Sequence, residues 1–375
     1  MRSMSHRERV RAALDRREGD RVPIDFGGTY ATIIHRSAYE RLKTHLGLEH
    51  GTTTLSERLG SLAIPDEAVQ RRFDVDTRCL GLGGYEGHDG EIDRNTFMDE
   101  WGSTWRKAED GHYLNVDGPF FDGRKPSLAD LETHPWPDPD NPGHYRGLGE
   151  RARALREDTD FAIVLNMPVG IVHRGQFLRG FADWLKDLYK DRAFIRRMME
   201  IATDHWIRVA VNALDAVGDD VDVVYLGDDL AIQSSTLFDP EIYRQLIKPH
   251  HRRMIAAIKA RGDIKVVFHS CGAVSPLIDD LIEIGADAIN PVQVAAKDME
   301  PEGLKRKFGD RIAFWGGIDT QSILPFAKPD EVRAEVRRII DCLGRGGGLV
   351  LATVHNIQRE VAPENIVAAF DEARI

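Results

Sequence analysis

The sequence is poor in cysteine and has no long apolar run. Three cysteines, Cys79, Cys271 and Cys342, are spread over 375 residues, which argues against the disulfide framework of a secreted domain. No apolar stretch is long enough to cross a bilayer as a helix, and the N-terminal segment lacks the apolar core of a signal peptide. We therefore expect a reduced, cytoplasmic protein with no membrane partner.

Basic clusters and phosphate-binding glycine loops are also absent. The formal net charge is −11 at pH 7, and no block of lysines and arginines with interleaved aromatics offsets it, so nucleic acid is not an expected partner. No Gly-x-Gly-x-x-Gly pattern follows the first strand-like run, which disfavours a dinucleotide-binding fold. The remaining composition, with 42% hydrophobic and 30% charged residues, is that of a globular protein with an ample core.

Strand-like and helix-like segments alternate through the second half of the chain. Each apolar run is followed by an amphipathic helix, and a proline stands at or near the first helical position. One such helix, opened by Asp239 and Pro240, contains Pro249 inside its apolar pattern, which predicts a kink. The five strand-like runs span residues 221–226, 265–268, 286–290, 312–315 and 348–354.

Three more strand candidates, at residues 22–26, 75–82 and 161–166, bring the number of predicted strands to eight. A long amphipathic helix is predicted at residues 191–217. Eight parallel strands with outer helices predict an α/β fold, a (β/α)8 TIM barrel formed by residues 1–375 as a single domain. Residues 83–140 do not fit the repeat, and their Gly-Asp turns predict a β-hairpin-like insertion that forms a rim or lid.

Polar side chains stand at the carboxyl ends of the predicted strands, which meet at one mouth in a TIM barrel. His269 and Cys271 end one run two residues apart, and His355 ends another. Alternation places the first two on one face of their strand. Two imidazoles and a thiolate with an open fourth position are typical of a catalytic zinc site. The alternative is a hydrogen-bonded histidine beside a small buried thiol.

Other residues at these ends are predicted to bind or act on a substrate. Asp228 and Asp229 follow one strand, and because adjacent residues point to opposite sides we expect one of them to do catalytic work. Helix capping and solvent-facing charge are the competing interpretation. The glycines at 316–317 form either a turn or a close approach of the backbone to a ligand or neighbour. The predicted substrate-binding residues are Asp25, Asn166, Asn290, Gln293, Asp319 and Gln358.

Two further pairs contain histidine. His250 and His251 lie within the helix that follows Asp239, and we predict that they are solvated or cap the helix. His173 and Arg174 follow a loop after a predicted strand. They are predicted to reach either substrate anions or the protein surface.

Four segments occur in the order expected of one known family. They are Arg21-Val22-Pro23-Ile24-Asp25-Phe26, His269-Ser270-Cys271-Gly272, Trp315-Gly316-Gly317-Ile318-Asp319-Thr320 and Ala362-Pro363-Glu364-Asn365. Together they resemble the uroporphyrinogen decarboxylase family, and the resemblance spans nearly the whole chain. It implies a (β/α)8 barrel with the active site at the carboxyl mouth.

The predicted site residues resemble one of two branches of that family. The porphyrinogen decarboxylases carry an arginine-rich stretch after the first strand, whereas residues 27–32 of this chain read Gly-Gly-Thr-Tyr-Ala-Thr and offer no cations to pair with a polycarboxylate. The cobalamin-dependent methyltransferase branch carries His-x-Cys and a distant cysteine as zinc ligands. This chain keeps His269 and Cys271, and the position of the distant cysteine falls on His355. The resemblance thus implies zinc held by two histidines and one cysteine.

That branch implies transfer of a methyl group between a corrinoid (cobalamin) and a small thiol or a methoxylated or methylated compound. The Asp-x-His-x-x-Gly signature of corrinoid-carrying domains is absent from the chain, so a separate corrinoid-carrying protein is the expected partner. Two histidines and one cysteine donate less negative charge to zinc than one histidine and two cysteines would, so they leave zinc a stronger Lewis acid. The competing expectations are a metal-free decarboxylase or lyase, in which Asp25 or Asp228 stabilises a protonated intermediate, and a non-catalytic ligand-binding barrel. A homodimer is an open alternative to a monomer.

Overall fold

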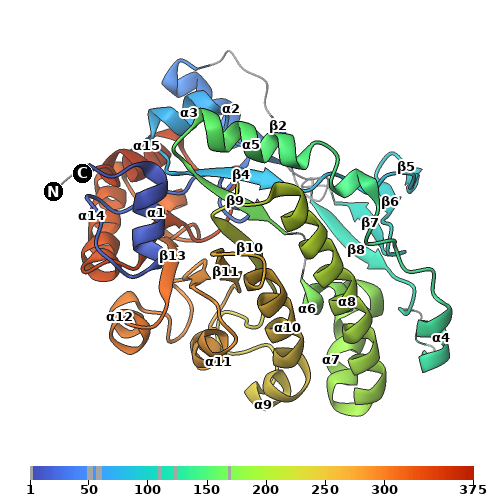
Figure 1. Ribbon diagram of the computed structural model, residues 1–375. Coiled ribbons are helices and arrows are strands. Elements are labelled where there is room, and N and C mark those ends of the chain that lie inside the picture. The colour runs from blue at the N-terminus through green and yellow to red at the C-terminus, as the bar shows by residue number, and fades with distance from the viewer. Residues whose placement is uncertain are drawn as a thin grey trace.

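Seven parallel strands curl into the wall of a barrel with helices outside it (Figure 1). The computed structural model describes residues 3–48, 54–55, 61–108, 112–121, 123, 125–167 and 170–375. The predicted α/β barrel is confirmed. Around the wall the strands are ordered β14 (Leu349–Thr353), β13 (Ala313–Ile318), β12 (Ala288–Asn290), β11 (Lys265–His269), β10 (Val223–Gly227), β9 (Ala162–Asn166) and β4 (Thr77–Gly81).

The segment around Ile24 closes the barrel between β14 and β4. Ile24 forms a parallel bridge with Leu351, where the Asp25 amide donates to the Leu351 carbonyl and the Leu351 amide donates to the Pro23 carbonyl. On the other side the Asp76 amide donates to the Ile24 carbonyl, while the Ile24 amide donates to the Asp76 carboxylate. The prediction of a regular strand here is wrong. Pro23 has no amide hydrogen to donate, and the Ile24 amide donates to the side chain of Asp76 instead of to a backbone carbonyl.

Helix α1 (His6–Leu14) packs against the interior of the barrel. A capping box starts the helix, in which the Ser5 hydroxyl accepts from the Glu8 amide and the Glu8 carboxylate accepts from the Ser5 amide. The barrel interior is filled mainly by alanine and valine side chains, with two large aromatic ones among them. This inner cluster consists of Val10, Ala13, Leu14, Ala31, Ala162, Val164, Val223, Tyr225, Val267, Ala288, Ala313, Trp315, Val350 and Ala352.

The long helix predicted at 191–217 and the proline-started helices predicted in the second half of the chain are present. Helix α8 (Arg192–Val217) begins after its cap Asp191, whose side chain accepts from the Phe194 amide. The kink predicted at Pro249 takes the form of a π-helical turn at residues 243–247, between α9 (Pro240–Ile242) and α10 (Lys248–Lys259). The other outer helices are α2 (Arg36–Leu46), α3 (Glu67–Arg72), α5 (Leu148–Asp158), α6 (Ile171–Arg179), α7 (Phe181–Lys190), α11 (Ile278–Glu283), α12 (Pro301–Phe308), α13 (Ile323–Phe326), α14 (Pro329–Ile339) and α15 (Pro363–Glu372).

Within residues 83–140, the part that the structure describes forms an antiparallel sheet and a short helix beside α6 and α8 (Figure 1). The predicted hairpin-like pattern extends to four strands, which pair in chain order. Trp101 packs on Trp206 of α8, and Trp105 packs on Phe177 of α6. The elements are β5 (Glu91–Asp93), β6 (Thr96–Met98), β7 (Thr104–Lys107), β8 (Tyr113–Asp117) and α4 (Leu128–Thr133).

A second small sheet contains β1 (Ile34–His35), β3 (Leu62–Ile64) and β2 (Thr54–Leu55), paired antiparallel in that order. Among the helices that the structure describes, none has the length and apolar character needed to cross a membrane.

Candidate metal centre

His269, Cys271 and His355 bring three metal-binding atoms together at the carboxyl ends of β11 and β14. Their donor atoms all lie within 4.8 Å of one another, and Nε2 of His269 is 3.5 Å from Sγ of Cys271. A tetrahedral zinc ion holds nitrogen and sulfur ligands about 3.3–3.6 Å apart. The donor set therefore fits zinc with a modest closure of the three side chains, and its imidazoles and thiol suit zinc better than magnesium or calcium.

Asn290 fixes the ring of His269 from behind. Its Oδ1 lies 2.6 Å from Nδ1 of His269, and its Nδ2 donates to the carbonyl of Trp315. Because an amide oxygen only accepts, Nδ1 of His269 carries a hydrogen, and Nε2 is the ring nitrogen that faces Cys271. Asn290, which the sequence predicts to bind substrate, thus contacts the back of a predicted metal ligand.

His355 lies across from His269, with the two ring centroids 6.2 Å apart. Although the side chain reaches solvent at the mouth, burial among protein atoms and the nearby His269 lower the pKa of His355 to about 4. At neutral pH the ring is therefore uncharged, which is the form that binds a metal ion.

Asp229 stands beside the three donors. Its Oδ1 accepts from the Cys271 amide at 2.8 Å and lies 3.5 Å from Nε2 of His269. Its Oδ2 lies 3.5 Å from Nε2 of His173, and 37% of the side chain is exposed. Burial disfavours the charged form, but His173 and His269 outweigh it and hold the pKa of Asp229 well below its ordinary value. Asp229 is the carboxylate that faces the donors.

Asp228 points the other way, into the protein. Its Oδ1 accepts from the His173 amide at 2.9 Å, and its Oδ2 lies 2.8 Å from Nε2 of His251. Burial disfavours the carboxylate charge, but these two histidines hold the pKa of Asp228 below its ordinary value. The prediction that His251 is solvated or caps its helix is wrong, because α10 turns this side chain toward the end of β10, where it is 2% exposed.

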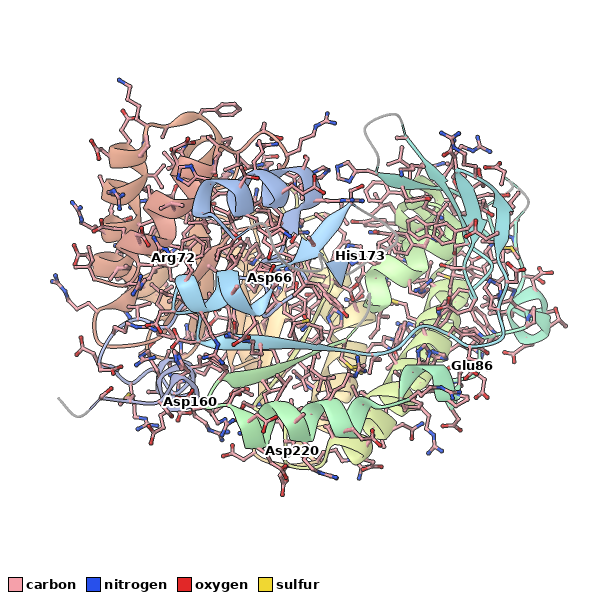
Figure 2. All side chains as sticks on the ribbon, turned by 90° about the horizontal axis from the view of Figure 1, so that it is seen from above. Asp66, Arg72, Glu86, Asp160, His173 and Asp220 are labelled. Carbon is pink, nitrogen blue, oxygen red and sulfur yellow. The ribbon has the colours of Figure 1, made fainter. Side chains whose placement is uncertain are left out.

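His173 lies near the start of α6 (Figure 2). Its two ring nitrogens contact Asp228 and Asp229. Its Nδ1 lies 3.3 Å from Oδ1 of Asp228. Burial opposes the charged imidazolium, but the two carboxylates outweigh burial and raise the pKa of His173 to about 9. The neighbouring Arg174 stacks over Trp101 and pairs with Asp99 of the insertion.

Asp25 is a fully buried carboxylate. Its Oδ1 accepts from the Gly28 amide and the Thr77 hydroxyl, and its Oδ2 accepts from the Thr32 hydroxyl and the Trp315 indole N–H. Burial raises the pKa of Asp25, and these four hydrogen bonds oppose the rise. The predicted substrate-binding residue is thus engaged on both oxygens by groups of the chain itself.

The remaining predicted substrate-binding residues contact the loops around the mouth. Each makes hydrogen bonds to backbone or amide groups of those loops, which fixes the loops relative to the strand ends. The contacts join Asn166 to Gly28 and Tyr30, Gln293 to Gly272 and Gln321, Asp319 to the Gln321 amide, and Gln358 to the Asn356 carbonyl.

Gly316 of β13 closely approaches the loop that follows β12. Its φ is +139°, and a Cβ there would lie 1.6 Å from the carbonyl oxygen of Pro291. The sequence left open whether residues 316–317 form a turn or a close approach of the backbone to a ligand or neighbour. Gly316 makes a close approach to a neighbouring segment.

The fold and the donor set define a TIM-barrel protein with a candidate metal centre at the mouth. Residues 121–374 match the model of the uroporphyrinogen decarboxylase (URO-D) family, so the chain belongs to this family, as its sequence motifs predict. It is similar to the uroporphyrinogen decarboxylase of Thioalkalivibrio sulfidiphilus (strain HL-EbGR7), at 24% identity over 70% of this chain and 73% of that enzyme. The match to the enzyme of Methylococcus capsulatus is 24% identical and spans about half of each protein, 49% of either chain.

A solved structure has the same fold. The methyltransferase from Methanosarcina mazei superimposes with a TM-score of 0.66 over 99% of both chains, at 20% sequence identity. The likeness extends over the insertion as well as the barrel, since nearly the entire chain is covered.

Proposed function

We propose that this protein is a zinc-dependent methyltransferase. It moves a methyl group between a corrinoid carried by a separate protein and a small molecule, either a thiol or a methoxylated or methylated compound. The observation that carries the proposal is the convergence of His269, Cys271 and His355, whose donor atoms lie within 4.8 Å of one another. The structural relative from Methanosarcina mazei is named a methyltransferase, and that name agrees with the proposal.

The residues of the chain prepare the donors for a metal ion. Asn290 sets the tautomer of His269, and a lowered pKa keeps His355 neutral. Asp229 accepts from the amide of Cys271 and so fixes the loop that carries the thiol. When bound, zinc would polarise the heteroatom of a methyl donor or lower the pKa of a thiol acceptor.

The carboxylate nearest the predicted substrate position is Asp229 rather than Asp228. Asp229 faces the donors and is 37% exposed, whereas Asp228 is 1% exposed and held between two histidines. The corrinoid would arrive at the same mouth on its own protein.

A metal-free decarboxylase or lyase is supported less well by the contacts of the aspartates. That reaction needs a carboxylate free to stabilise a protonated intermediate. Both oxygens of Asp25 accept hydrogen bonds from the chain, and both oxygens of Asp228 contact histidines. Residues 27–32 also contain no cation for the carboxylates of a porphyrinogen.

Metal analysis and methyl transfer test the proposal. We expect the purified chain to hold one zinc ion and to pass a methyl group from methylcobalamin to a small thiol, or from a methyl donor to cob(I)alamin. Cys271→Ala should lose both zinc and activity, while the matched control Cys342→Ala should keep both, because Cys342 lies on the turn after α14 and away from the donors. A zinc-free protein in which Cys271→Ala keeps full activity would refute the proposal.

A further inference from the structure

His173 is held by Asp228 at two points. The backbone amide of His173 donates to Oδ1 of Asp228 at 2.9 Å, and Nδ1 of its ring lies 3.3 Å from the same oxygen. The ring also stacks on Phe177, one turn further along α6, with an interplanar angle of 26°. In this orientation Nδ1 of the imidazole faces the buried aspartate and Nε2 faces away from it.

Asp228 is itself fixed from behind. Its second oxygen lies 2.8 Å from Nε2 of His251, and Nδ1 of His251 lies 3.3 Å from the hydroxyl of Tyr243. Asp228, His251 and Tyr243 are each no more than 2% exposed. A carboxylate that orients a histidine through Nδ1 and leaves Nε2 for the substrate is the arrangement that serves proton transfer in many hydrolases.

The Nε2 atom of His173 faces the metal donors across Asp229. It lies 3.5 Å from Oδ2 of Asp229, and the other oxygen of Asp229 lies 3.5 Å from Nε2 of His269. A contact of 3.5 Å is longer than an ordinary hydrogen bond of about 2.7–3.2 Å, so this N–H is loosely held. The His173 side chain is 23% exposed, so part of the ring reaches solvent.

We infer that His173 is the general acid of a demethylation reaction and that the substrate is a methyl ether. His173 gives its Nε2 proton to the ether oxygen while that oxygen loses its methyl group at the metal centre. This inference rests on the proposed function and adds to it both the class of methyl donor and the residue that protonates the product. Asp228 acts as the positioning residue that holds His173.

The step balances in atoms and electrons. The bond between the methyl carbon and the ether oxygen breaks, and its electron pair stays on oxygen. The methyl carbon forms a new bond with the two electrons of Co(I) in the partner's corrinoid, which becomes Co(III). The Nε2 proton of His173 passes to the oxygen, so the product leaves as a phenol or an alcohol. Solvent then returns a proton to His173.

The chemistry of the centre favours oxygen over sulfur. An alkoxide or phenolate is a poor leaving group unless it is protonated, whereas a thiol acceptor must lose its proton to react and gains nothing from an acid. Two imidazoles and one thiolate donate less negative charge to zinc than one imidazole and two thiolates would. The resulting zinc ion is better suited to a hard oxygen ligand. The pKa of about 9 for His173 keeps the ring protonated at neutral pH and lies close to the value of about 10 for a phenol.

A series of aryl methyl ethers tests the role of His173. The zinc-loaded chain would be given free cob(I)alamin and either 4-nitroanisole, whose phenol is the most acidic, or anisole and 4-methoxyphenol, whose phenols are similar to each other and less acidic. His173→Gln removes the acid but keeps a similar volume. We expect it to slow anisole and 4-methoxyphenol on the order of 100–1000-fold, and 4-nitroanisole by less than about tenfold, because a good leaving group needs little protonation. Asp228→Asn should show the same trend.

Two controls separate chemistry from damage to the fold. His250→Gln changes the neighbouring helix at a side chain that contacts Thr203 rather than Asp228, and it should leave all rates unchanged. In His173→Ala, added imidazole should restore part of the anisole rate, which a misfolded chain would not allow.

The histidine 15N spectrum of the zinc-loaded protein gives a measurement that does not depend on catalytic turnover. There the His173 signal should show a protonated Nδ1 that Asp228→Asn perturbs, with zinc content unchanged in every variant.

The outcomes distinguish the inference from the proposed function. Equal slowing of all ethers by His173→Gln would overturn the general-acid role. If the wild-type chain transfers methyl from methylcobalamin to a thiol but demethylates none of the ethers, the inference fails while the proposed function stands. If the chain binds no zinc and moves no methyl group in either direction, the proposed function fails and the inference with it.

Discussion

The Oδ1 atom of Asn290 lies 2.6 Å from the Nδ1 atom of His269, directly behind the candidate metal centre. Asn290 ends β12 and His269 ends β11, and the two residues pair in the register of these strands. The strand ladder itself therefore places a hydrogen-bond acceptor on the far side of a predicted ligand. This arrangement fixes the ring so that Nε2, the nitrogen that would bind the metal ion, faces the other donors.

Replacing Asn290 with alanine should weaken zinc binding without removing a predicted ligand. Loss of an outer partner that orients a histidine ligand costs about 10–100-fold in metal affinity. Competition with a chromophoric chelator would measure the change. Asn212→Ala is a suitable control, because Asn212 contacts Asp140 at an exposed site. An affinity equal to that of the wild type would show that Asn290 does not set the ring of His269.

His355 offers a second test of the donor set. His355→Ala should lower zinc affinity by more than the ~10–100-fold expected for an outer partner, whereas His355→Cys should restore it, since the family's methyltransferase branch carries a thiolate there. The same chelator competition applies, with His45→Ala as the control because His45 is 38% exposed on α2. Equal zinc affinity in His355→Ala and the wild type would remove His355 from the proposed ligands.

Asp25 leads to a prediction about stability. One oxygen accepts from the Gly28 amide and the other from the Trp315 indole, and these two groups can only donate. In Asp25→Asn the side-chain NH2 must face one of them, whichever way the amide turns. We expect the free energy of unfolding in urea to fall by about 2–3 kcal/mol. Asp310→Asn, at a side chain that is 82% exposed, should change it little, and equal values for the two variants would contradict this account.

The sequence pattern locates most of the barrel because apolar runs and helix starts are local signals. The run predicted at 265–268 becomes β11, which ends at His269, and the helix predicted at 191–217 becomes α8, which spans Arg192–Val217. The segment at 22–26 departs from the pattern for a non-local reason. Its amide at Ile24 is bound by the side chain of Asp76, 52 residues away.

The contacts behind the metal donors cannot be predicted from local sequence patterns either, because their partners are far apart in the chain. Asp228 contacts His173 and His251, which are 55 and 23 residues away in the chain. They meet only when α6 and α10 pack at the end of β10. Nothing in the sequence around His251 indicates its contact with Asp228, so the prediction that His251 is solvated or caps its helix was wrong. His269 and Cys271 could be recognised from the sequence because they stand two residues apart where a strand-like run ends.

The last prediction concerns His205, which is buried between the insertion and the barrel. Its ring packs against Trp101 at 4.5 Å and Trp206 at 5.0 Å between centroids. Burial, and then the nearby Arg174, lower the pKa of His205 to about 3. In the unfolded chain the pKa returns to about 6.5, so between these values the unfolded state binds a proton that the folded state does not. This contribution to stability is complete above pH 6.5 and is lost as the pH falls toward 3.

His205→Phe keeps an aromatic ring in this position and removes its titration. Between pH 7 and pH 5 the free energy of unfolding of the wild type should fall by about 2 kcal/mol more than that of the variant. Urea unfolding at the two pH values measures the difference, and comparison of the two proteins cancels the other titrating groups, including His173, whose raised pKa acts with the opposite sign. The same substitution at the exposed His45 should leave the pH dependence as it is in the wild type. If His205→Phe and the wild type lose equal stability between pH 7 and pH 5, His205 is not held neutral at the junction of the insertion and the barrel.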